Sequence, residues 1–152
     1  EGWFHLQPLL CRLLSQRYAY TLGGLVMIRR DIRLDKYDWD VRCFIGYDSG
    51  DAVHLCNELM TIGCGSEATS KAYRHFISGG ESRGLTYSNV KDKVSVVTIG
   101  HSEEESEMVN TIGHELLHVT AHICEVYDID MSGEQACYII GELCGKVFNS
   151  VK

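Results

Sequence analysis

Three absences narrow the class of this protein before any motif is considered. No apolar run is long enough to cross a membrane, and the stretch from Leu6 to Leu14 is also broken by Pro8 and Arg12. No basic segment precedes that stretch, so it is a poor match to a secretory signal. Basic residues are also few, because 14 Lys and Arg stand against 21 Asp and Glu and give a formal net charge of −7. This charge argues against nucleic acid or an anionic membrane as the main partner.

The cysteines lack the spacing of a zinc knuckle, since no C-x-x-C pair occurs among them. Their number is odd, and several fall on apolar faces of predicted helices. We therefore interpret them as reduced, mostly buried thiols of a cytoplasmic protein, in preference to a disulfide framework. The seven are Cys11, Cys43, Cys56, Cys64, Cys124, Cys137 and Cys144.

The length and composition indicate one folded domain. The chain has 152 residues, of which 45% are hydrophobic, and it contains no internal repeat, low-complexity tract or linker. It begins with Glu1, and Met27 directly precedes a clean strand pattern. We therefore interpret residues 1–26, with weak helical periodicity over 5–19, as an extension of vector or upstream origin, and residues 27–152 as the domain.

The pattern of apolar residues predicts an α+β fold. Alternation over 26–34 and an apolar run over 41–46, separated by a polar turn, predict a β-hairpin. Two more strands and four helices are expected from periodicity and from glycines that end helices. The strands are 85–87 and 94–99, and the helices are 49–60, 66–79, 102–127 and 132–148. The expected architecture is a small, mostly antiparallel sheet packed on helices.

The segment 113–118 carries the chemical signal, because it contains the pattern H-E-x-x-H within a predicted helix. His114 and His118 are four residues apart and project from one helix face, so both imidazoles can reach one metal ion. Glu115 lies beside them, where it can take a proton from a metal-bound water. The alternative is a solvated helix face with two ordinary histidines. A metal site is favoured by the long helix, by the β-branched strand before it and by the following helix, which carries an acid.

A catalytic zinc ion needs a third protein ligand and keeps one position for water. The downstream candidates are His122, Glu125, Asp128, Asp130, Glu134 and Glu142. His122 is unsuitable, because eight residues of helix place its Cα about 12 Å from that of His114; we expect it to line the cleft or to pack beside it. Glu134 is preferred, since its helix can fold back antiparallel to the motif helix, and Glu142 is the second choice. The ordinary alternative for Glu134 is a charge at a helix N-terminus.

With the motif helix followed by Ser132-Gly133-Glu134-Gln135-Ala136-Cys137-Tyr138, the chain resembles minimal gluzincin-type metallopeptidases. It is most similar to small uncharacterised phage and prophage proteins of gut bacteria, in which an S-G-E-E-x-A-Y-like helix follows H-E-x-x-H. Segments 38–41 and 84–89 also look familiar from that group. The resemblance implies a zincin-like fold over 27–148. It also implies one Zn²⁺ ion bound by His114, His118 and Glu134, with Glu115 as the general base. Gln135 replaces a second acid that is common there, and the metzincin continuation H-x-x-G-x-x-H is absent.

These observations predict a zinc-dependent metallopeptidase acting on a peptide or protein substrate. Glu115 would pass the proton of the attacking water to the leaving amine. Tyr138 and His122 are candidate donors to the tetrahedral intermediate. The strand over 94–99 is either an edge that pairs with an extended substrate or an ordinary core strand. Two alternatives remain: a catalytically silent zincin-like interaction module, and a regulator that cleaves a single phage or host partner protein.

Overall fold

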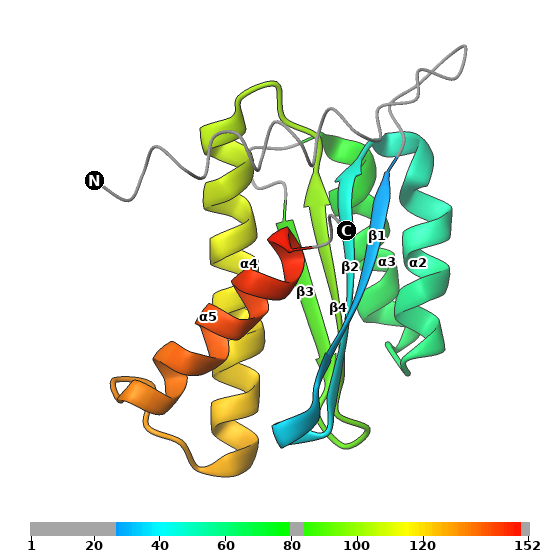
Figure 1. Cartoon of the computed structure of the whole chain (residues 1–152). Coiled ribbons are helices and arrows are strands. Elements are labelled where there is room, and N and C mark those ends of the chain that lie inside the picture. The colour runs from blue at the N-terminus through cyan, green and yellow to red at the C-terminus, as the bar shows by residue number, and fades with distance from the viewer. Residues whose placement is uncertain (1–26, 80–83, 150–152) are drawn as a thin grey trace.

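The chain folds around a four-stranded mixed sheet with helices on both faces (Figure 1). The computed structural model describes residues 27–79 and 84–149, so the predicted extension over 1–26 and its helix lie outside the described residues. The strands are β1 (Ile28–Leu34), β2 (Trp39–Tyr47), β3 (Gly84–Asn89) and β4 (Val94–Gly100). They lie in the order β1-β2-β4-β3. The pairs β1–β2 and β3–β4 are antiparallel and the central pair β2–β4 is parallel, so the α+β class is confirmed and the sheet is mixed.

The first two strands form the predicted hairpin. Their register runs from Ile28 opposite Ile45 to Leu34 opposite Trp39. A short 3-10 helix and Asp38, which adopts a left-handed backbone with φ of +51°, reverse the chain between them. Trp39 is fully buried and Tyr37 is almost fully buried. These two side chains anchor the turn to the core.

Two helix pairs cover the two faces of the sheet (Figure 1). Helices α2 (Ala52–Thr61) and α3 (Ser66–Ser78) enclose one apolar cluster with the sheet; its largest members include Phe44, Leu55, Leu59 and Phe76. Helices α4 (Glu105–Tyr127) and α5 (Glu134–Phe148) enclose the other, which includes Trp39, Val97, Leu116, Ile123, Ile139 and Leu143. Each fully buried aliphatic or aromatic side chain contributes about 1.5–3 kcal/mol, so both faces are firmly anchored.

Local polar contacts move the starts of two helices from their predicted positions. Helix α4 begins three residues after the predicted Ser102, because the Ser102 hydroxyl accepts from the Glu104 N–H and donates to Glu107 in a turn before the helix. Helix α5 begins at Glu134 and not at Ser132, because the Asp130 carboxylate accepts from both the backbone N–H and the hydroxyl of Ser132.

The strand immediately before the motif helix is a core strand. Strand β4 pairs with β2 on one side and β3 on the other, so it offers no free edge to a substrate. Of the two interpretations left open for this segment, the edge role is therefore wrong. The edge strand next to β4 is β3, which pairs antiparallel with β4 and lies against α4.

The six described cysteines are free thiols, in agreement with the interpretation of reduced residues. Four are buried, one is partly buried and one is exposed. In that order they are Cys43, Cys56, Cys64, Cys124, Cys144 and Cys137. Across residues 27–79 and 84–149, no helix is both long and apolar enough to cross a membrane.

Candidate active site

Helix α4 brings the two motif histidines together on its exposed side. The Nε2 atoms of His114 and His118 are 3.1 Å apart, and the ring centroids are 4.8 Å apart. Two nitrogens bound at roughly 2.0–2.1 Å to one tetrahedral zinc ion would lie about 3.3 Å apart. The pair therefore fits a shared ion, and imidazole nitrogen suits zinc, copper, iron or nickel.

The motif glutamate faces the sheet. Glu115 is only 4% exposed, and its carboxylate lies under the edge strand β3. The Thr86 hydroxyl donates to Glu115 Oε2 at 2.6 Å, and the same hydroxyl lies 3.2 Å from the Glu115 carbonyl oxygen. A buried carboxylate needs such a donor, because an unpaired one would be costly. Thr86 therefore fixes the orientation of the predicted base, a role that the motif alone did not reveal.

Strand β3 leaves room for that carboxylate because residue 84 is glycine. A Cβ atom added at Gly84 would lie 2.3 Å from Glu115 Oε1, far inside van der Waals contact. Along β3, Gly84, Thr86 and Ser88 face α4, and Leu85 and Tyr87 pack towards α2 and α3. Small or hydroxyl residues alternate here with large ones, and this period of two is the sequence signal that could have located the contact.

The structure brings together two of the three predicted metal ligands. Among residues 27–79 and 84–149, no three His, Cys, Asp or Glu side chains form a group that could hold a metal ion. Glu134 lies exposed in the first turn of α5, and Glu142 is paired with Lys146 at 2.7 Å. Helix α5 does fold back across α4, as expected (Figure 1). Glu134 as the third ligand stays a prediction.

The two candidate donors differ in their surroundings. His122 lies one turn after His118, and its Nδ1 atom is 2.7 Å from the Ser88 hydroxyl of β3. Burial lowers the pKa of His122 below its ordinary value; His118 lowers it further, and Glu125 opposes the shift. Tyr138 is 73% exposed on α5. The structure therefore ties His122 to the sheet, and the role of Tyr138 stays a prediction.

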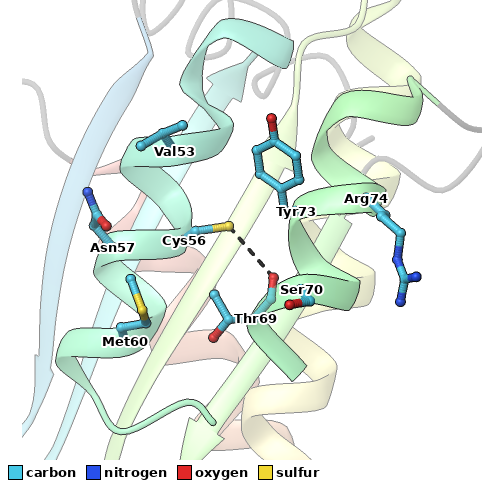
Figure 2. A pocket seen from close by; sticks show the side chains of 8 residues that line it. All are labelled: Val53, Cys56, Asn57, Met60, Thr69, Ser70, Tyr73 and Arg74. Carbon is cyan, nitrogen blue, oxygen red and sulfur yellow. Dashed lines mark hydrogen bonds between the residues drawn. The ribbon is translucent and has the colours of Figure 1, made fainter. Parts of the chain in front are cut away.

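Two hollows lie away from the histidine pair. One, of about 460 Å³, is between α2 and α3, on the opposite face of the sheet (Figure 2). It is lined by Val53, Cys56, Asn57, Met60, Thr69, Ser70, Tyr73 and Arg74. Figure 2 shows the Cys56 thiol directed at the Thr69 carbonyl and Arg74 extending away from α2, so the hollow brings no acid and base together. The other, of about 450 Å³, lies between α3 and β3 and reaches Gly84 and Thr86.

No protein-family model, curated protein or solved structure matches this chain. The site itself therefore carries the indication of function, through the short distance between two imidazole nitrogens and a buried carboxylate held by a threonine on the adjacent strand.

Proposed function

We propose that this protein is a zinc-dependent metallopeptidase with a zincin-like active site. One observation carries the proposal: two exposed imidazole Nε2 atoms lie 3.1 Å apart on the same helix as a buried, hydrogen-bonded glutamate. Peptide hydrolysis at a metal needs these two elements, a cation site open to substrate and a carboxylate that accepts a proton. In this proposal His114, His118 and Glu134 bind the ion.

The residues of the site divide the chemistry between them. A zinc ion held there would supply Lewis-acid activation of a water molecule and of the scissile carbonyl. The Glu115 carboxylate would accept a proton from the attacking water and return it to the leaving amine. Thr86 restrains the Oε2 atom of Glu115, so the carboxylate keeps one orientation while it accepts and releases the proton.

The edge strand β3 supplies a docking place for the substrate. Its outer edge lacks a partner strand within the described sheet, and its inner face contacts α4 at Glu115. An extended peptide could add to this edge by main-chain hydrogen bonds, which is a common mode of peptide recognition. Side chains that alternate along such a peptide would face α4 or the hollow between α3 and β3.

Metal content tests the ligand set. Elemental mass spectrometry of the purified protein is expected to find about one zinc per chain, because a catalytic site binds a single ion through three side chains. A Glu134→Ala variant is expected to lose most of that zinc, and Glu142→Ala to retain it. Wild-type protein that takes up no metal after zinc addition would overturn the hydrolase proposal. If the Glu134→Ala variant retained its zinc, Glu134 would be excluded as a ligand, but the zinc site itself would not.

Substitution of the base tests the reaction. A Glu115→Gln variant keeps a carbonyl oxygen for Thr86 and removes the proton acceptor, so zinc should remain and peptide turnover should fall by roughly 10²- to 10⁴-fold. The two-histidine geometry also fits a non-catalytic zincin-like interaction module. That alternative gains support if the wild type binds zinc and a partner protein, hydrolyses nothing, and Glu115→Gln binds the same partner equally well. A regulator with a single protein substrate would instead show the partner trapped by Glu115→Gln and cleaved by the wild type.

A further inference from the structure

A series of buried and partly buried hydrogen bonds crosses three strands of the sheet and ends on the motif helix. Trp39 of β2 lies with its Nε1 atom 2.9 Å from the Ser95 hydroxyl of β4. Ser95 lies 2.7 Å from the hydroxyl of Ser88, its cross-strand partner on β3. Ser88 in turn lies 2.7 Å from Nδ1 of His122 on α4. Trp39 and Ser95 are fully buried, so water does not complete their hydrogen bonds.

The direction of the hydrogens along this series follows from its first member. An indole N–H can only donate, so the Ser95 oxygen accepts from Trp39. The Ser95 hydrogen is then donated to Ser88, and the Ser88 hydrogen is donated to Nδ1 of His122. If His122 donated to Ser88 instead, Ser88 could donate to Ser95, which would leave the fully buried Ser95 hydroxyl hydrogen without an acceptor among the described residues. Ser88 could otherwise accept from both Ser95 and His122, which would leave its own hydrogen without an acceptor among the described residues.

We propose that the hydrogen-bonded series Trp39–Ser95–Ser88 holds the His122 proton on Nε2 and so makes His122 a hydrogen-bond donor one turn beyond His118, not a metal ligand. A ring nitrogen that carries a proton cannot bind a metal ion. His122 follows His118 by one helical turn, and its Nε2 atom makes no hydrogen bond with the described residues. The group that it binds is a carbonyl oxygen of a peptide lying beside His114 and His118, a part of the inference that depends on the proposed function.

The tautomer can be measured on the full chain without metal or substrate. In a long-range ¹H–¹⁵N correlation spectrum of ¹⁵N-labelled protein, we expect His122 to show a protonated Nε2 and an unprotonated Nδ1. Its signals are assigned by their absence from a His122→Phe variant. A protonated Nδ1 in the wild type would overturn the proposal, and this measurement requires no substitution at Ser88 or Ser95.

Two substitutions at Ser88 test whether the hydrogen-bonded series Trp39–Ser95–Ser88 sets the tautomer of His122. Ser88→Ala removes the donor to Nδ1 and should give a mixture of the two tautomers. Ser88→Thr keeps the hydroxyl and should restore the wild-type spectrum, which a purely structural role of Ser88 would not require. A His122 spectrum that is unchanged in a folded Ser88→Ala protein would show that Ser88 is not a positioning residue and would overturn the proposal.

Peptide turnover separates the donor role from metal binding. His122→Phe is expected to retain zinc, to lower kcat by about 10²-fold and to leave KM nearly unchanged, as for loss of one donor to a developing oxyanion. Loss of zinc from this variant would identify His122 as a ligand and overturn the proposal. If the wild type hydrolyses no peptide, the proposed function fails, and the tautomer measurement still decides the role of the hydrogen-bonded series Trp39–Ser95–Ser88.

Discussion

The contact between Gly84 and Glu115 gives the sharpest test of the site. Replacing Gly84 by alanine adds one methyl group, and its carbon would lie 2.3 Å from Oε1, 2.6 Å from Cγ and 2.7 Å from Cδ of Glu115. Carbon atoms in contact normally lie about 3.5–4.0 Å apart. The carboxylate or the strand must therefore move by roughly 1 Å.

Neither partner can move without loss. The motif helix is fixed by buried core residues before and after Glu115, which are Ile112, Leu116 and Val119. If the carboxylate moves, it leaves the Thr86 hydroxyl; if β3 moves, its pairing with β4 is disturbed. Overpacking of this kind costs about 1–3 kcal/mol. A misplacement of about 1 Å at a reacting group can lower turnover by about 10²-fold.

Urea denaturation and peptide turnover measure the two effects. Gly145→Ala in α5 is the matched control, because its added carbon meets no atom within 4 Å, and a helical alanine should raise the free energy of unfolding by about 0.5–1 kcal/mol. A double-mutant cycle identifies the cause. In a Glu115→Ala background the carboxylate is gone, so Gly84→Ala should lose most of its cost, which gives a coupling of about 1–3 kcal/mol.

Two results would refute this reasoning. The first is a Gly84→Ala protein with wild-type stability and turnover, which would mean that Glu115 does not lie beneath β3. The second is a destabilisation of equal size in the Glu115→Ala background, which would place the clash elsewhere. The cycle is measured on stability alone, so it decides the packing even if no substrate is known.

The remaining predictions concern the thiols and one helix end. Burial, helped by Asp31, raises the pKa of Cys43 to about 12 from an ordinary value of 9.0. Between those values the unfolded thiol loses its proton and the folded one keeps it, so stability should fall as pH rises through this range, by up to roughly 4 kcal/mol. Urea denaturation from pH 8 to 11 should show this slope in the wild type and a shallower one in Cys43→Ala. Iodoacetamide at pH 8 should modify exposed Cys137 and spare Cys43 in the folded protein, as mass spectrometry of peptides would show; modification of both at equal rates would contradict the burial. Asp128 has a φ of +53° and a negative charge at the C-terminal end of α4, so Asp128→Gly should raise the free energy of unfolding by about 0.5–1 kcal/mol and Asp128→Asn by less. A lower midpoint in urea for both variants would refute this account.

The elements of the fold were largely predictable from local pattern. The alternation over 26–34 gave β1, and the apolar periodicity around the motif gave α4, because a strand or helix with one buried face imposes its period on the sequence. The order of strands was not predictable in the same way. Whether β3 or β4 lies at the edge depends on pairings between segments far apart in the chain, and the larger apolar content of β4 only favours the inner position. The helix starts were displaced by the side chains of Ser102 and Asp130, which satisfy backbone groups locally.

The site was predictable only where its residues are close in sequence. His114, Glu115 and His118 follow from helical spacing alone, and the structure places the two histidine nitrogens near each other. Thr86 and Ser88 precede the motif by about thirty residues, and the alternation along β3 marks their shared face without indicating which helix that face contacts. Their contacts arise because β3 lies across α4, a tertiary relation that a single sequence does not encode in any short window.

The six residues of strand β3 must therefore both shape the candidate site and fill the apolar core. Its face of Gly84, Thr86 and Ser88 must fit a carboxylate and an imidazole, and its other face of Leu85 and Tyr87 must fill the core against α2 and α3. Because the side chains of a strand alternate strictly, a slip of one residue in the pairing with β4 would exchange the two faces. Bulky side chains would then meet Glu115, and hydroxyls would enter the apolar core without partners. The geometry of the site and the register of the sheet are thus stabilised by the same contacts, and substitutions on either face of β3 should change both.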